Sequence, residues 1–341
     1  MSNPAAAAAQ PDPALIWDTM NAYQRTAALK AAIELDLFTA IAEAVHTPDA
    51  LAARCTASSR GLRILCDYLT IIGFLSKDAG EYSLTPTSAA FLDRSSPSCM
   101  ASIVRFINSP KLMSGFSNLT DVVRRGGTVL PSGGVTEEEF DDWVTFAESM
   151  APLMGPASEF ISDIACRDGY QPHRVLDIAA GHGLFGIAVG RTAAQAEIVA
   201  QDWPNVLAVA QTNAQNAGIG DRYRLLPGDA FTVDYGTGYD VALVTNFFHH
   251  FDEPTCESLI KKLHAALDPG GRVITLEFVP NSDRVTPPIP ASFSLMMLGA
   301  TPNGDAYTME QYDRMFRSAG FRRNDLLQVP NSPEQLIVST T

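Results

Sequence analysis

A chain of 341 residues is long enough for two or three domains of ordinary size, and we expect two. Hydrophobic residues make up 46% of the chain but form no run long enough to span a membrane, and residues 1–13 lack the features of a signal peptide, so we expect a cytoplasmic protein. The five cysteines form no CxxC pair, and we expect them to be reduced thiols. The net charge of −14 would repel a phosphate backbone, which disfavours nucleic acid as a partner.

Residues 1–95 are predicted to form a small helical domain. Apolar residues recur at steps of three and four between residues 15 and 44, which indicates one long helix or two joined ones. Thr47-Pro48-Asp49 begins a short helix, because threonine caps well and proline suits the first helical position. A longer helix over residues 59–73 and an alternating hairpin over residues 75–85 follow, which completes the element order of a winged helix.

A winged helix can bind DNA, but here the longer helix offers only Arg60 and Arg63 as basic residues among many apolar ones. Packing or dimerisation fits its apolar faces better, so we predict a homodimer formed through this domain. Residues 96–170 are expected to be a helical linker, with helices over residues 97–124 and 137–165.

The character of the sequence changes at Gln171-Pro172. Short apolar runs then alternate with helical patterns, which indicates parallel strands joined by crossover helices over residues 171–341. A helix over residues 308–319 is followed by two strands joined through a short turn, and such strands pair antiparallel. We therefore predict an α/β fold with a Rossmann-like sheet, parallel except for one strand, that has helices on both faces.

Three strand ends of this sheet could form one nucleoside-sized site. The first strand ends in a run of small residues from Asp177 to Gly183, where a helix begins and free amides can face a ligand. About 20 residues further on, Asp202 ends the second strand, where an acid can receive two ribose hydroxyls. The third turn, residues 227–231, could hold adenine. A dinucleotide remains possible on these features, although the first turn lacks the GxGxxG spacing.

At these motifs the sequence resembles the class I S-adenosylmethionine-dependent O-methyltransferases, the family of plant caffeic acid and flavonoid enzymes and of bacterial polyketide and antibiotic tailoring enzymes. The resemblance extends over nearly the whole chain. Its motifs are DIAAGHG, QDWPNV, PGDAF and the catalytic segment NFFHHFDEPTC. The resemblance implies an N-terminal winged-helix dimerisation domain, S-adenosyl-L-methionine as cofactor, and a small-molecule hydroxylated acceptor.

The resemblance also assigns roles. Counting back from Cys256 puts the catalytic histidine at His249, with the carboxylate that steadies it at Glu277. The residues implied to bind cofactor are Asp177, Ala179, Gly181, Gly183, Asp202, Asp229, Ala230, Phe231, Thr245 and Phe251. Those implied to face the acceptor are Met150, His250 and Asp305, where His250 replaces the family's aspartate and Asp305 lies one position from a second family carboxylate, which falls on Ala306. Met150 is equally compatible with core packing.

The chemistry of a histidine at this place is consistent with methyl transfer to oxygen. An imidazole can take a phenol proton, and a carboxylate on its other nitrogen fixes the tautomer. Three alternatives stay open: methylation of carbon or nitrogen, a two-histidine and one-carboxylate iron site, and a winged-helix regulator that senses the cofactor. The sequence does not name the acceptor, but O-methylation of a small aromatic or polyketide-like metabolite without a metal is the leading hypothesis.

Overall fold

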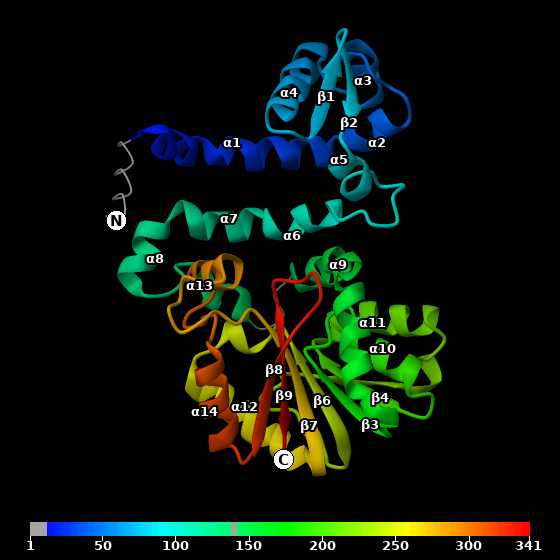
Figure 1. The fold of residues 1–341 in the computed structure, drawn as a ribbon, viewed down its shortest axis with the longest axis vertical. Helices are drawn as coiled ribbons and strands as arrows, with labels where there is room; N and C mark the ends of the chain where they lie inside the picture. The colour runs from blue at the N-terminus through cyan, green and yellow to red at the C-terminus, as the bar shows by residue number, and fades with distance from the viewer. Residues whose placement is uncertain (1–11, 138–141) are drawn as a thin grey trace, which may run out of the picture. The chain divides into compact units, whose positions relative to one another are not determined.

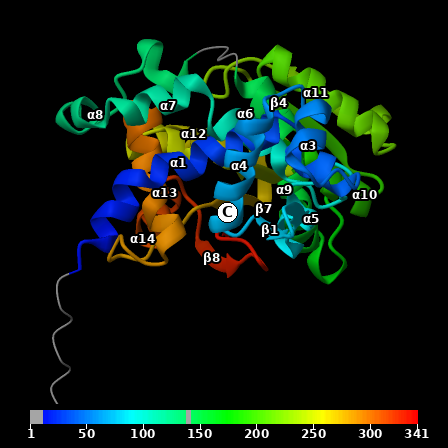
Figure 2. The ribbon, with the colours of Figure 1, turned by 90° about the horizontal axis from the view of Figure 1, so that it is seen from above.

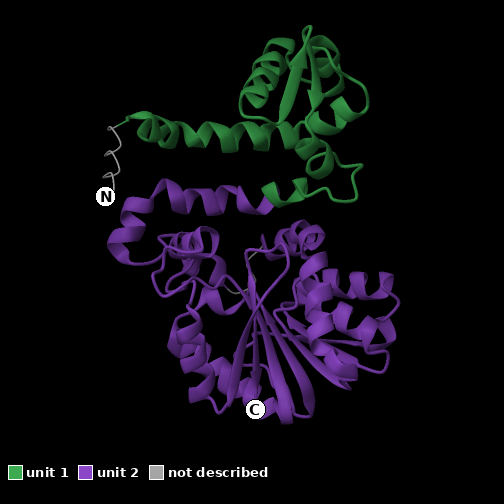
Figure 3. Ribbon diagram, in the orientation of Figure 1, with its two compact units in different colours: residues 1–104 green, residues 105–341 purple. Residues whose placement is uncertain are grey.

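The structure is a computed structural model that describes residues 12–137 and 142–341. The chain divides into two compact units, Met1–Val104 and Arg105–Thr341 (Figure 3). Across the described residues, every helix is too short or too polar to cross a membrane. The predicted three-part division at residues 95 and 170 stays a prediction.

The N-terminal unit has the predicted order of helices and hairpin. Its elements are α1 (Ala14–Glu34), α2 (Leu37–Ala42), α3 (Pro48–Arg54), α4 (Ser59–Ile71), β1 (Leu75–Asp78), β2 (Glu81–Leu84) and α5 (Pro86–Phe91). Asp36 adopts a left-handed conformation that separates α1 from α2, so the first helical pattern is two joined helices. The Thr47 hydroxyl accepts a hydrogen bond from the Ala50 N–H at the start of α3, which confirms the predicted cap.

The N-terminal unit buries a single apolar cluster around Phe38, Leu51, Leu69 and Tyr82. The first half of α1 does not take part in it. Five large apolar side chains there are 60–76% exposed: Leu15, Ile16, Trp17, Met20 and Tyr23. Several large apolar side chains exposed on one helix are typical of an interface.

The C-terminal unit is built on a seven-stranded sheet of order β5-β4-β3-β6-β7-β9-β8 (Figure 1). Its strands are β3 (Arg174–Ile178), β4 (Glu197–Asp202), β5 (Tyr223–Pro227), β6 (Tyr239–Thr245), β7 (Leu267–Glu277), β8 (Arg323–Gln328) and β9 (Gln335–Thr340). The pairs from β5 to β7 are parallel, and β9 pairs antiparallel with both β7 and β8. The predicted sheet is confirmed, including its final antiparallel pair.

Helices cover both faces of this sheet. Those of the C-terminal unit are α6 (Val104–Ile107, which starts at the unit boundary), α7 (Pro110–Ser117), α8 (Leu119–Arg125), α9 (Asp142–Ala165), α10 (Leu184–Thr192), α11 (Pro204–Asn216), α12 (Glu253–Ala266), α13 (Pro288–Ala300) and α14 (Met309–Ser318). One core cluster joins the sheet to α9, α10 and α11, and a second joins it to α12 and α14. Figure 1 and Figure 2 show α10 and α11 on the opposite side of the sheet from α12 and α14.

The helices differ from the sequence-based expectations in two details. The segment 97–124 is not one helix, because Ser109 caps a new helix at Pro110 and Asn118 separates α7 from α8. The sequence patterns also gave no sign of α13, whose apolar residues lack a polar face. In the predicted helix over 137–165, residues 138–141 lie outside the described residues, and α9 accounts for the remainder from Asp142.

Candidate active site

A cleft of about 520 Å³ opens at the carboxyl ends of the parallel strands, where open α/β sheets bind ligands. The three predicted strand ends meet in it. Nine residues predicted from the sequence line the cleft: Ala179, Gly181, Asp202, Asp229, Ala230, Phe231, Thr245, His250 and Phe251. The convergence inferred from the motifs is therefore present in the fold.

The turn after β3 combines tight backbone geometry with small residues. Ala179 and Gly181 have φ of 50° and 56°, a region that side chains disfavour. Asp177 lies beneath the turn and not on the cleft surface, where its buried Oδ2 accepts a hydrogen bond from the Gly186 N–H at 3.1 Å. Gly183 also lies beneath, at the start of α10, where a Cβ atom would come within 2.5 Å of the Tyr223 hydroxyl. Asp177 and Gly183 therefore support the turn from beneath, without lining the cleft.

The end of β4 supplies the acid of the cleft. Asp202 accepts hydrogen bonds from the N–H of Gly181 at 2.8 Å and of Trp203 at 2.7 Å. Burial raises the pKa of Asp202 to about 6. Its neighbour Gln201, which sequence reasoning missed, donates to the Gly228 carbonyl at 2.5 Å and accepts from the Ala179 N–H at 3.4 Å, so it joins three strand-end turns.

Aromatic side chains form one wall of the cleft. Phe231 lies 4.8 Å from Phe251 in an edge-on contact and 6.1 Å from Phe247 in a stacked one, measured between ring centroids. Asp229 accepts the Phe231 N–H on Oδ1 at 2.9 Å, which fixes the start of this turn and leaves Oδ2 for a ligand. A carboxylate beside aromatic faces suits a flat ring that carries an amino group.

His249 and Glu277 form a buried pair at the ends of neighbouring strands. His249 lies in the short 3-10 turn Phe248–His250 that follows β6, and Glu277 is the last residue of β7, which pairs parallel with β6. The His249 Nδ1 and Glu277 Oε2 atoms are 2.5 Å apart. Glu277 Oε1 accepts the backbone N–H of Phe247 at 3.0 Å and of His249 at 3.4 Å, so one carboxylate holds both the turn and the ring.

Burial disfavours charge on both partners of this pair. It lowers the pKa of His249, which keeps the imidazole neutral at pH 7, and it raises the pKa of Glu277. When Glu277 is ionised, Nδ1 donates its proton to Oε2, and Nε2 is then the basic nitrogen. The pair can therefore accept a proton at Nε2 and spread the resulting positive charge onto a carboxylate that is already in place.

Comparison with known proteins decides the family. A family model described as the O-methyltransferase domain matches residues 166–322, and one described as the O-methyltransferase dimerisation domain matches residues 17–94. The crystal structure of a protein of Nostoc punctiforme PCC 73102, assigned as an O-methyltransferase, has a TM-score of 0.94 at 48% identity and covers 97% of this chain and 100% of that chain. The chain belongs to the O-methyltransferase family.

Two curated relatives extend this result at lower identity. The tetracenomycin polyketide synthesis 8-O-methyl transferase TcmO of Streptomyces glaucescens is 27% identical over 306 residues, 88% of each chain. The S-adenosyl-L-methionine-dependent methyl transferase PigF of Serratia sp. (strain ATCC 39006) is 26% identical over 331 residues, 94% of this chain and 93% of PigF. The predictions of fold class, family and enzyme class are confirmed, and the chain is an S-adenosylmethionine-dependent O-methyltransferase.

The cleft of this O-methyltransferase fits its cofactor. S-adenosylmethionine carries two ribose hydroxyls, an adenine ring with an amino group, and a methionine end. The partly buried carboxylate of Asp202, the free Oδ2 of Asp229 beside the aromatic wall, and the close-approach turn at Gly181 match these groups in kind. Among residues 12–137 and 142–341, the His, Cys, Asp and Glu side chains form no group of three that could hold a metal ion.

The other predicted acceptor residues lie in different surroundings. His250 lines the cleft beside His249, with ring centroids 4.2 Å apart, and its Nδ1 donates to the Phe247 carbonyl at 3.1 Å, so Nε2 is free to accept. Trp143 and Phe146 of α9 line the cleft next to it, and sequence reasoning missed both. Met150, on the same helix, is partly buried and is not among the described residues that line the cleft.

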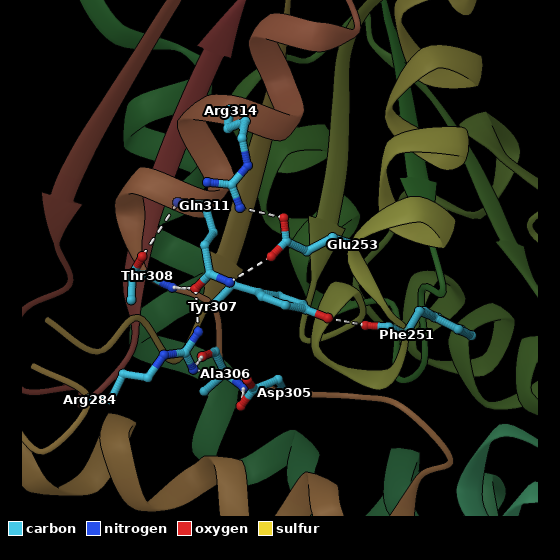
Figure 4. Close-up of polar contacts among 9 residues, drawn as sticks. All are labelled: Phe251, Glu253, Arg284, Asp305, Ala306, Tyr307, Thr308, Gln311 and Arg314. Carbon is cyan, nitrogen blue, oxygen red and sulfur yellow. Dashed lines mark hydrogen bonds and ion pairs between the residues drawn. The ribbon is translucent and has the colours of Figure 1, made fainter. Parts of the chain in front are cut away.

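Asp305 is not among the described residues that line the cleft. Its carboxylate forms an ion pair of 2.9 Å with Arg284, which also donates to Gln311 at 2.7 Å (Figure 4). Gln311 in turn donates to Glu253 at the start of α12, and Tyr307 donates to the Phe251 carbonyl (Figure 4). Asp305 therefore belongs to a network that ties the segment before α14 to the end of the catalytic turn.

Proposed function

We propose that this enzyme transfers a methyl group to a hydroxyl of a small aromatic or polyketide-like metabolite, with His249 as general base. The observation that carries the proposal is the 2.5 Å hydrogen bond between His249 Nδ1 and Glu277 Oε2, next to His250, which lines the cleft. With Glu277 ionised, this hydrogen bond favours the tautomer in which Nε2 accepts a proton.

The protein has two tasks in this reaction: to align the acceptor hydroxyl with the methyl group of the cofactor, and to remove the proton of that hydroxyl. Bound S-adenosylmethionine supplies an electrophilic methyl group on its sulfonium. His249 Nε2 takes the proton of the acceptor hydroxyl as the oxygen becomes nucleophilic, and Glu277 supports the imidazolium that forms. Burial of the pair excludes water, which strengthens this support.

We assign the cofactor to eight strand-end positions that line the cleft and to the two residues that support the first turn. Asp202 would accept the ribose hydroxyls, Asp229 and Phe231 would hold the adenine, and the turn at Gly181 would receive the methionine end. Thr245, Ala179, Ala230 and Phe251 complete the cleft wall, with Asp177 and Gly183 behind the turn. Cofactor contact by these residues remains a proposal.

Two observations support an aromatic acceptor. The cleft beside His250 is lined by Trp143 and Phe146, which stand in edge-on contact with each other at 5.3 Å, and flat apolar faces of this kind favour flat apolar ligands. The relative TcmO is named for methylation during polyketide synthesis. Acceptor contacts by Met150 and Asp305 stay predictions, of which the geometry favours neither.

We further propose that the enzyme is a homodimer formed through the N-terminal unit. The match to a dimerisation domain over residues 17–94 and the exposed apolar half of α1 support this.

The proposed function is tested by incubating the enzyme with S-adenosylmethionine and a panel of phenols, aromatic amines and carbon acids, and identifying the products by mass spectrometry. We expect methyl ethers of phenols from the wild type, little product from His249→Ala, and normal yield from His173→Ala, a control histidine that is exposed. Methylation of the amines or carbon acids alone would refute the assignment to aromatic hydroxyls.

A further inference from the structure

A second buried carboxyl group lies close to the catalytic pair. Glu334 is 5% exposed and directly precedes β9, whose Gln335 pairs with Glu277 in the sheet register. Its position is beyond the segment 166–322 that the O-methyltransferase domain matches. The side chain of Asn246, as a hydrogen-bond donor, lowers the pKa of this carboxylate, and the Ser332 hydroxyl donates a hydrogen bond to it at 3.3 Å.

Asn246 is the residue at which the chain leaves β6 for the catalytic turn. It has φ of 54°, a left-handed conformation that asparagine tolerates at some cost in free energy. Its N–H donates to the Leu276 carbonyl at 2.8 Å. The next N–H groups, of Phe247 and His249, then face Glu277, so the direction of the turn is set at Asn246.

We propose that Glu334 is a positioning residue for methyl transfer, which acts through Asn246 to hold the turn that carries His249. The proposal rests on the assignment of His249 as base, but it concerns the geometry of the turn and not the acceptor.

The surroundings explain why a carboxylate is needed there. Burying a carboxylate costs free energy, because it removes the charge from water. Burial accordingly raises the pKa of Glu334 to about 7, and the nearby charge of Glu277 raises it too. The hydrogen bond to Asn246 offsets part of that cost and restrains a side chain whose backbone is in a strained region. Glu277 and Glu334 thus hold the same turn from two strands, one through backbone N–H groups and one through the Asn246 amide.

The test compares four single variants and one double variant by proton NMR of the enzyme labelled with ¹⁵N-histidine. A proton in a short imidazole–carboxylate hydrogen bond resonates far downfield of backbone amides, and loss of the signal in His249→Ala assigns it to His249 Nδ1. Glu334→Gln keeps an acceptor for Asn246, whereas Glu334→Leu removes it at similar volume. Asn246→Gly keeps the left-handed backbone but removes the amide.

We expect Glu334→Gln to retain the downfield signal, and Glu334→Leu and Asn246→Gly each to shift or lose it. Combining the last two changes should add nothing further, because both remove the same contact. With any acceptor that the wild type methylates, turnover should fall at least about tenfold in Glu334→Leu and Asn246→Gly, since small displacements of reacting groups are costly.

Several results would overturn the proposal. These are an unchanged signal in Asn246→Gly, equal damage from the Gln and Leu replacements, additive effects in the double variant, or no downfield signal in the wild type. If Glu334→Leu does not fold, the downfield signal of Asn246→Gly alone tests the proposal. Because the signal is read without an acceptor, failure of the enzyme to methylate phenols would refute the proposed substrate class and leave this test intact.

Discussion

Asp202 offers the sharpest test of how the cleft holds its cofactor. Replacing Asp202 by alanine removes a carboxylate that lines the cleft and that also accepts the N–H groups of Gly181 and Trp203. Loss of charge-assisted hydrogen bonds to two ribose hydroxyls should weaken binding by about 1–3 kcal/mol, or roughly 5- to 150-fold in Kd. Isothermal titration with S-adenosylhomocysteine measures this directly.

The pH dependence of the dissociation constant gives an independent test of the role of Asp202. Burial raises the pKa of Asp202 to about 6, so in the free enzyme the carboxylate is ionised above pH 6 and protonated below it. If the ionised form is the one that accepts the hydroxyls, affinity is complete at pH 8 and falls by about fourfold at pH 5.5. Burial holds the pKa of His250, in the same cleft, at about 3, outside this window.

Asp202→Asn is the matched control, because it keeps the size of the side chain and cannot titrate. Its weaker binding should be independent of pH between 5.5 and 8. Affinity within twofold of the wild type in Asp202→Ala, or a wild-type Kd that does not change with pH, would contradict the role given to this carboxylate.

Three further predictions concern assembly and packing. Trp17→Glu combined with Met20→Glu should convert a dimer into a monomer in light scattering at micromolar concentration, and a monomeric wild type would refute the proposed interface. Gly304→Ala should destabilise the enzyme by about 1–3 kcal/mol and slow turnover, because its Cβ would lie 2.2 Å from the His249 carbonyl oxygen. As a control, Gly61→Ala on α4, where a Cβ would meet only Ser58 at 3.7 Å, should stabilise the enzyme by about 0.4–1 kcal/mol in urea unfolding. Tyr307→Phe should cost about 1 kcal/mol in the same assay through loss of the bond to the Phe251 carbonyl, and an unchanged midpoint would show that the bond contributes nothing.

The sequence was most informative where local pattern and chemistry coincide. The strand-to-helix alternation fixed which residues end strands, and parallel strands bring their carboxyl ends to one edge. Gly181, Asp202 and Asp229 could therefore be assigned to one cleft before any geometry was known, and all three line it. The pairing of His249 with Glu277 was implied by the family resemblance, and it agrees with this argument, since β6 and β7 are neighbours.

Features that depend on tertiary placement could not be read from the sequence. Trp143 reaches the cleft from a helix about 100 residues before the catalytic turn, and an aromatic residue on an amphipathic helix is ordinarily core. Asp305 lies one residue from the expected position, but Arg284 holds its side chain elsewhere. Glu334 comes from the last turn of the sheet, with no local pattern to mark it. Cytoplasmic location stays a prediction.

The role of His249 as general base is tested most directly by the pH–rate profile of His249→Ala with a phenolic acceptor at saturating S-adenosylmethionine. At pH 7, we predict turnover about 10²–10⁴-fold below the wild type, with a rise toward the wild-type rate as the pH approaches the pKa of the phenol, because an ionised acceptor needs no base. A near-normal rate for His249→Ala at neutral pH would show that alignment alone drives the transfer, and would contradict the assignment of His249 as the base.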